Sequence, residues 1–194
     1  TTIVGEVESL KALVDEFSQF ARMPAPRRES TDVHALLLRI LVLYDGLFEH
    51  VRIETLFAVD LPRVRLDPDQ VRRVIINLVD NAIEAINQQG QVVVETHHDP
   101  GTNLVRIVLA DDGPGIAPAD REKRVMPYYS TKKRGSGLGL AIVRHIAELH
   151  GGRIEARASR PHVGLRLAQR RDRVVIVLRA VEAGLDEVRR AIRA

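Results

Sequence analysis

The stretch DPDQVRRVIINLVDNAIEAINQQG, at residues 67–90, constrains the fold more than any other part of the sequence. Pro68 in the first turn, acidic residues at the start and Gly90 after the end predict a helix over residues 68–89. Its apolar residues recur at helical spacing and form one wide stripe: Val71, Val74, Ile75, Leu78, Val79, Ala82, Ile83 and Ile86. We therefore expect a helix with one broad side facing a core.

Another face of the same helix carries Asn77, Asn81 and Glu84, at positions i, i+4 and i+7. Asparagine is a poor helix former because its amide competes for backbone hydrogen bonds. Two interpretations are open. The face is either solvated, or it is a row of amide oxygens that bind a hard cation such as Mg²⁺ or orient phosphates.

The surrounding segments predict a compact unit of mixed helices and strands. Helices are expected in residues 30–48, which open with polar capping residues, and in residues 138–152, which end with Gly151 and Gly152. Strands are expected at residues 51–59, 91–96, 104–110 and 153–159, and the turn-rich HHDPGTN joins the middle pair into a hairpin.

The first of two glycine clusters, LADDGPGI at residues 109–116, directly follows one of these strands. A carboxylate at a strand end, followed by Gly-x-Gly, places an acceptor beside backbone that a ligand can approach closely. Such an acceptor could bind the exocyclic amino group of adenine, which guanine does not offer at that edge. The alternative is a tight turn rich in Asp and Gly.

The second cluster, STKKRGSGLGLAIV at residues 130–143, places Gly135, Gly137 and Gly139 just before a helix. Backbone N–H groups and the positive end of the helix dipole make an anion site there, beside the cations of residues 132–134. Alone, the segment could be a flexible connection. In the order amide helix, Asp-Gly-x-Gly, charged lid-like segment and Gly-x-Gly-x-Gly helix, the signals predict an adenine nucleotide site.

These motifs resemble those of a known family. NLVDNAIEA resembles the N box of sensor histidine kinases, DDGPGI and GSGLGLAIV resemble their two glycine boxes, and PYYSTKK resembles the box between them. Together they cover about residues 70–152 and are the ATP-binding motifs of the wider GHKL superfamily. Their sequences are most similar to those of nitrogen-regulation sensor kinases. The resemblance implies an α/β two-layer sandwich, the GHKL or Bergerat fold, with a mixed sheet covered on one face by helices.

The resemblance also implies the cofactors and the site residues. The cofactors are ATP and Mg²⁺; Asn81 would bind Mg²⁺, Asp111 would bind the adenine amino group, and Asn77 and Lys132 would act in catalysis. The implied ATP-binding residues are Asn77, Asn81, Asp111, Gly113, Gly115, Ile116, Thr131, Lys132, Gly135, Ser136, Gly137, Leu138, Gly139 and Leu140. Asn77 stands where the ATPases of the superfamily have a water-activating glutamate, and an amide cannot act as a general base. That favours transfer to a protein acceptor over hydrolysis.

The N-terminal residues 1–22 are expected to form a helix with an apolar seam at heptad spacing: Ile3, Val7, Leu10, Val14, Phe17 and Ala21. The segment resembles the second helix of a histidine kinase dimerisation hairpin, which implies a homodimer. The alternative is that it packs on its own domain. We expect residues 23–31 to be a linker and residues 32–194 to be the catalytic domain, with an atypical basic tail at about 160–194.

No histidine lies in the His-Glu/Asp-x-x-x-Pro context of a phosphoacceptor. We therefore expect the chain to be part of a longer protein, which transfers phosphate to a histidine on another helix for relay to a response regulator receiver domain. The chain alone is not expected to autophosphorylate. The remaining alternatives are a GHKL-type ATPase, an anti-sigma-like serine kinase and a non-catalytic interaction module.

Composition limits the other partners. The net charge of +3 is uneven, because residues 153–194 hold 11 Arg against five acids while the rest of the chain is net negative. This excess indicates a solvated tail or a partner-binding patch rather than nucleic-acid binding. The tail lacks the family's usual closing strand, so it is expected either to complete the sheet differently or to contact another subunit. Zero Cys and no long apolar run indicate a cytoplasmic chain, with the parent protein either soluble or anchored in the inner membrane.

Overall fold

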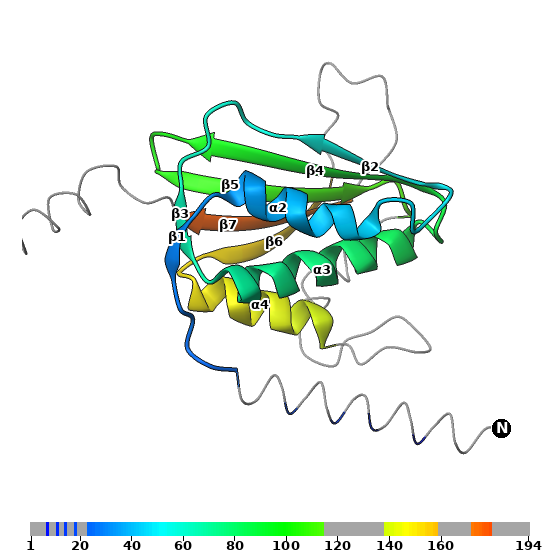
Figure 1. The fold of residues 1–194 in the computed structure, drawn as a ribbon, viewed down its shortest axis with the longest axis horizontal. Helices are drawn as coiled ribbons and strands as arrows, with labels where there is room; N and C mark the ends of the chain where they lie inside the picture. The colour runs from blue at the N-terminus through cyan, green and yellow to red at the C-terminus, as the bar shows by residue number, and fades with distance from the viewer. Residues whose placement is uncertain are drawn as a thin grey trace, which may run out of the picture.

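The computed structural model describes residues 23–114, 138–158 and 172–179, together with Val7, Lys11, Val14 and Ser18. In this part of the chain, helices cover one face of a five-stranded sheet, and a two-stranded sheet lies at one end (Figure 1). The predicted two-layer α/β sandwich is confirmed. None of the helices in the described ranges is both long and apolar enough to cross a membrane.

The large sheet is mixed. Its strand order is β2-β4-β5-β7-β6, with β2 parallel to β4 and every other neighbouring pair antiparallel. The predicted hairpin is confirmed as β4 and β5, in which Val94 pairs with Leu109. The strands are β2 (Val51–Leu56), β4 (Gly90–Asp99), β5 (Leu104–Asp111), β6 (Arg153–Ala158) and β7 (Asp172–Arg179).

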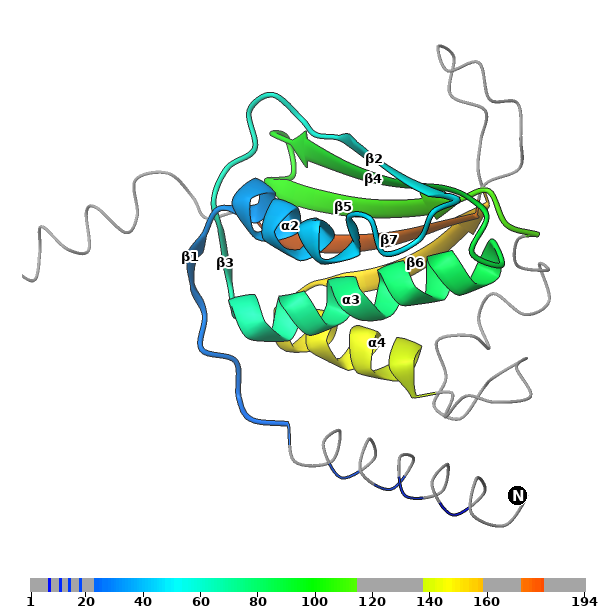
Figure 2. The same ribbon diagram turned by 45° about the vertical axis from the view of Figure 1, so that its right-hand side comes forward.

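Three helices form the second layer in the described residues: α2 (Val33–Leu41), α3 (Pro68–Ala85) and α4 (Gly139–Leu149). A 3₁₀ turn, η1 (Val42–Tyr44), continues α2. Figure 2 shows α3 lying between α2 and α4 in front of the sheet. The helix α3 ends four residues earlier than predicted, because Asn87 and Gln88 take the left-handed φ values of 52° and 57°.

The predicted apolar stripe of α3 is buried against the sheet. All eight of its residues belong to one core that also contains Val92 and Val94 of β4 and Ile107 and Leu109 of β5. Burial of such a stripe contributes about 25 cal/mol for each Å² of apolar surface removed from water. The buried stripe fixes the rotation of α3 about its axis. It therefore also fixes the direction in which the asparagine side chains on the other face of the helix point.

Two segments that were not predicted to be strands join the fold. Residues 29–31, within the predicted linker, form β1 (Glu29–Thr31), which pairs antiparallel with β3 (Val64–Leu66). Residues 172–179 of the basic tail form β7, which lies between β5 and β6. Of the two expectations for the tail, this segment completes the sheet.

Candidate nucleotide-binding site

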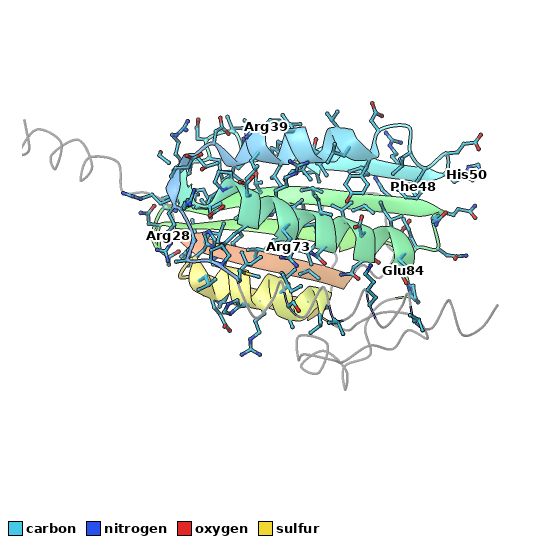
Figure 3. All side chains as sticks on the ribbon, turned by 60° about the horizontal axis from the view of Figure 1, so that its bottom comes forward. Arg28, Arg39, Phe48, His50, Arg73 and Glu84 are labelled. Carbon is cyan, nitrogen blue, oxygen red and sulfur yellow. The ribbon has the colours of Figure 1, made fainter. Side chains whose placement is uncertain are left out.

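The helix α3 places Asn77 and Asn81 one turn apart, half-buried beside α4. The Asn77 side-chain N–H donates to the carbonyl oxygen of Arg73, 2.9 Å away and one turn earlier. This bond turns the Asn77 side-chain oxygen away from its own helix. Figure 3 labels Arg73 and Glu84, which lie along α3 before and after the two asparagines.

The first residue of α4 lies against these two amides. A Cβ on Gly139 would lie 3.0 Å from the Asn77 Oδ1 atom and 4.0 Å from the Asn81 Nδ2 atom. Glycine at this position therefore lets the helix start approach the amides closely. The structure thus brings together two motifs that are some 60 residues apart in the sequence, the N box and the second glycine box.

The start of α4 has the features of an anion site. Its N-cap residue, Leu138, is fully buried, and its side chain makes no capping hydrogen bond. The first N–H groups of a helix have no acceptor within the helix, and the dipole makes this end positive. A negatively charged group such as a phosphate is stabilised at such an end.

Asp111, the last residue of β5, lies at the other end of the site. Its Oδ1 atom accepts from the Gly113 N–H at 3.0 Å. A Cβ on Gly113 would lie 2.7 Å from that oxygen and 3.0 Å from the carbonyl oxygen of Ala85, at the end of α3. The loop at Gly113 therefore packs closely on α3, at a point one helical turn, or about 6 Å, along the helix from Asn81.

The parts of the candidate site follow one another along α3. Starting from Asn77, the amides lie against the start of α4, and the Asp111 turn follows at Ala85. An acceptor for a base at one end and an anion site at the other match the two ends of a nucleotide. The described residues thus bring together Asn77, Asn81, Asp111, Gly113, Leu138 and Gly139 from the predicted site, while Leu140 packs half-buried against the core.

The remaining predicted site residues lie outside the described residues: Gly115, Ile116, Thr131, Lys132, Gly135, Ser136 and Gly137. The catalytic role of Lys132 and the charged lid-like segment therefore stay predictions. In the described ranges, no group of three or more His, Asp or Glu is arranged to hold a metal ion. An amide oxygen on α3 still fits Mg²⁺, because this ion commonly takes one or two protein ligands and completes its shell with water and phosphate oxygens.

Two acidic residues beside the site have roles that the sequence did not reveal. Asp112 accepts from the Gln91 N–H at 2.8 Å and so joins the two strands at the open end of the hairpin. Its role therefore differs from that of Asp111. Asp80, next to Asn81, accepts from the Tyr44 hydroxyl at 2.7 Å, and burial together with this bond raises the pKa of Tyr44. The Asp-Asp and Asp-Asn pairs were visible in the sequence, but only the tertiary contacts separate their members.

Comparison with known proteins supports the geometry. Residues 66–181 match the family described as histidine kinase-, DNA gyrase B- and HSP90-like ATPases. The sensor histidine kinase ZraS of Salmonella typhi is 34% identical over 155 residues, covering 79% of this chain and 33% of ZraS. The sensory histidine kinase/phosphatase NtrB of Rhizobium leguminosarum bv. phaseoli is 33% identical over 169 residues, covering 79% of this chain and 44% of NtrB.

A solved structure agrees in fold. The crystal structure of full-length ShkA in complex with AMPPNP superposes with a TM-score of 0.73 at 25% identity, over 91% of this chain and 37% of ShkA. The chain therefore spans less than half the length of these relatives. The matched motifs, the fold and the juxtaposed amides and helix start agree: the chain belongs to the family of histidine kinase-, DNA gyrase B- and HSP90-like ATPases, as a domain of the sensor histidine kinase type.

Proposed function

We propose that this chain binds Mg-ATP and is the catalytic domain of a sensor histidine kinase. The observation that carries the proposal is the contact of Gly139, at the positive end of α4, with Asn77 and Asn81 of α3. It places the Asn77 side-chain oxygen, a hard ligand, and the Asn81 amide group beside an anion site, which suits a metal-bound polyphosphate. The family match and the kinase relatives support the same activity.

We assign adenine recognition to Asp111. Its carboxylate is oriented by the Gly113 N–H, and the bond fixes the side chain before any ligand arrives. A fixed acceptor loses little entropy on binding, and it favours adenine because the exocyclic amino group of that base donates. The close packing of Gly113 on the end of α3 keeps this acceptor at a set distance from the amides.

Phosphate binding falls to the first turn of α4 and to Asn81. The N–H groups of the helix start would hold the phosphates, and the Asn81 oxygen would hold Mg²⁺ against them. Bound Mg²⁺ would supply neutralisation of the phosphate charge, which is the main electrostatic need of phosphoryl transfer. The phosphate-side contacts implied by the family also belong to this proposal: Thr131, Lys132, Gly135, Ser136 and Gly137.

The acceptor is proposed to be a histidine and not water. Asn77 is a neutral amide with no basic group, so it cannot remove a proton from water, and its N–H₂ group is bonded to its own helix. In this proposal the histidine lies on a dimerisation helix, residues 1–22 contribute to a homodimer, and the phosphate passes to a response regulator. We further propose that the chain lies in the cytoplasm, as part of a sensor whose remaining part either spans the inner membrane or is soluble.

Calorimetric titration with Mg-ATP tests the site, with wild type compared with Asp111→Ala. We expect binding by wild type and a loss of at least tenfold in the variant, because the adenine amino group would be left without its acceptor in a buried position. Asp99→Ala is the matched control. Asp99 also accepts an N–H two residues ahead, from Gly101, but it lies at the opposite end of the hairpin. Equal affinity in wild type and Asp111→Ala would contradict the adenine assignment.

The acceptor is tested by supplying a separate hairpin that carries a phosphoacceptor histidine. Labelled phosphate should appear on the hairpin only when wild-type chain and Mg-ATP are both present. Steady ATP hydrolysis by the chain alone, unaffected by the hairpin, would instead identify an ATPase. Absence of nucleotide binding in every variant would identify an interaction module.

A further inference from the structure

The segment at residues 23–28, here called the connector, is bonded to the catalytic domain. The Arg27 N–H donates to the Asp67 Oδ2 atom at 2.8 Å, and the Gln70 side chain donates to the Pro24 carbonyl oxygen at 2.9 Å. The Arg28 guanidinium donates to the Leu149 carbonyl oxygen at the end of α4. Figure 3 shows Arg28 at the end of the molecule where α3 begins and α4 ends.

His150, the C-cap of α4, is 6% exposed and bonds through both ring nitrogens. Its Nδ1 atom lies 2.8 Å from the Ile146 carbonyl oxygen, and because a carbonyl only accepts, Nδ1 carries the proton. The Asp67 N–H donates to Nε2 at 2.9 Å, so Nε2 carries none. The ring is therefore neutral, in one defined tautomer, and a second proton on Nε2 would break the bond to Asp67.

Asp67 connects three parts of the molecule. Its N–H bonds to His150 of α4, while its carboxylate caps α3 by accepting from the Asp69 and Gln70 N–H groups at 3.1 Å each. The same carboxylate holds the connector through the Arg27 N–H. Displacement of Asp67 would therefore disturb the end of α4, the start of α3 and the connector together.

The helix α4 joins this contact to the nucleotide site. Its 11 residues span about 16 Å, with Gly139 against the amides at one end and His150 against Asp67 at the other. Between the two ends, Ile142 and Ile146 are each 1% exposed within the core. A well-packed helix moves as a unit, so release of one end changes the position of the other.

We propose that His150 is a positioning residue that couples the connector to the nucleotide site: the neutral ring holds α4 and the connector on Asp67, and protonation of the ring releases both. The nucleotide half of this inference rests on the proposed function, whereas the connector half does not. A change in connector docking and a change in nucleotide affinity would then occur over the same pH range.

Burial sets the direction in which the pKa of His150 shifts. Burial chiefly lowers the pKa of His150 below its ordinary 6.5, and the nearby Arg28 lowers it further, while the Ile146 carbonyl and Asp67 partly offset the change. The neighbouring charges on α4 and β6 are paired, Arg144 with Glu148 and Arg153 with Glu155. A lowered pKa means that the contact is complete above the ordinary pKa and is lost as pH falls below it.

The connector is tested without nucleotide, by hydrogen exchange at the Arg27 amide at pH 7.5 and pH 5.5. His150→Gln is the informative variant, because its side-chain oxygen can accept from the Asp67 N–H and does not titrate in this range. At pH 5.5 we expect faster exchange in wild type than in His150→Gln, and equal exchange at pH 7.5. His97→Gln, on the opposite face of the sheet, should behave as wild type. Equal exchange in wild type and His150→Gln at both pH values would overturn the proposal.

Mg-ATP affinity is then measured with the same three proteins at both pH values. Phosphate groups titrate near pH 6, so variants are compared at one pH and not across pH. At pH 5.5 the Mg-ATP affinity of wild type should be lower than that of His150→Gln, by at most about tenfold per pH unit, the limit for a single proton. Absence of binding in all three would contradict the proposed function but leave the exchange result to decide the connector.

Nitrogen NMR of the wild-type His150 ring is a measurement that needs no variant. The expected spectrum at neutral pH is that of a neutral ring with its proton on Nδ1, which titrates below the ordinary 6.5. A proton on Nε2 at neutral pH would overturn the proposal even if His150→Gln fails to fold.

Discussion

At the scale of single residues, the site depends on positions where a side chain is absent. Gly113 and Gly139 each lie where an added Cβ would come within 3.0 Å of a polar oxygen. Each of these glycines lies beside another residue of its motif. The glycines of the motifs therefore allow neighbouring groups to approach closely, as well as making the backbone flexible. The asparagines complement the glycines, because their short polar side chains fit into the space that a missing Cβ leaves.

We expect Gly139→Ala to weaken Mg-ATP binding about tenfold, or roughly 1.4 kcal/mol. The added Cβ would lie 3.0 Å from the Asn77 oxygen, so either the amide or the helix start must shift. Folding should change less, because alanine favours the helix by about 0.5–1 kcal/mol relative to glycine. Calorimetry and urea denaturation measure the two effects. Gly101→Ala is the control, since its Cβ would meet only Asp99 at an ordinary 3.4 Å.

We expect Asn81→Ala to weaken ATP binding when Mg²⁺ is present and to change it little when the ion is removed by a chelator. The reason is that the amide oxygen is proposed to act on the metal ion and not on the nucleotide directly. Nucleotide titrations of wild type and variant, with and without chelator, give the four affinities. An equal loss in both conditions would mean that Asn81 only supports the packing of α3.

At the scale of elements, the helix α3 holds the two ends of the site and the contact with the connector. Its apolar stripe fixes its rotation, Asp67 fixes its start, and the left-handed residues after Ile86 fix its end. Asn77 and Asn81 belong to this helix, and an added Cβ on Gly113 or Gly139 would lie 3.0 Å from one of its oxygen atoms. The stability of its first turn is therefore open to a direct test.

We expect Asp67→Ala to destabilise the fold by about 1–2 kcal/mol through loss of the helix cap. Burial would raise the pKa of Asp67, but the N–H groups of Gln70, Arg27 and Asp69 outweigh it, with a smaller contribution from His150 once its ring is protonated, so the pKa lies below the ordinary 3.8. The carboxylate therefore contributes stability above that pH, and the contribution is lost as pH falls through the lowered pKa.

Urea denaturation at a series of pH values checks this expectation. The difference between wild type and Asp67→Ala should be constant near neutrality and shrink below about pH 4. Asp67→Asn is the control, because asparagine also caps helices and does not titrate. A difference that persists unchanged at low pH would show that the carboxylate charge does not contribute.

The elements also show what a sequence can predict. The helices α3 and α4 and the hairpin of β4 and β5 were predicted because their periodicity and turn residues are local signals. The strands β1 and β3, of three residues each, are too short for a periodic signal. The run at residues 174–178 has the composition of a buried strand, but its place between β5 and β6 is a long-range pairing that no local pattern encodes.

The site follows the same division. Asn77, Asn81, Asp111 and the glycines could be found because each departs from what its helix or strand alone would prefer. The meeting of Gly139 with Asn77, and the bond between Asp67 and His150, join residues more than 60 positions apart. Such contacts depend on how the layers pack, which the sequence determines only through the whole fold.

At the scale of the whole molecule, the catalytic domain does not bury the residues described before it. Val7 and Val14, one heptad apart on a helix, are 59% and 52% exposed. Exposed valines at this spacing lie on the predicted heptad seam and have no cover within the described chain. A second copy of the same helix would bury both.

We expect the chain to self-associate, and the double variant Val7→Asp with Val14→Asp to be monomeric at the same concentration. Charges in an apolar seam cost more than the valines gain, because they lose hydration without a partner. Sedimentation equilibrium over a range of concentrations measures the change. Val59→Asp is the control, since Val59 is 96% exposed on the catalytic domain. Strictly monomeric wild type at high concentration would refute the seam.

The bonds of the connector have a consequence for the engineering of hybrid sensors. A hybrid of this kind would join the input part of one kinase to the catalytic part of another, and residues 23–31, predicted here to be a linker, would be the natural place for the junction. Here the Pro24 carbonyl, the Arg27 N–H and the Arg28 side chain are all bonded to the catalytic part, and Met23 packs against its core. A junction placed inside residues 23–31 would exchange these partners, so a transferable catalytic cassette should begin before Met23.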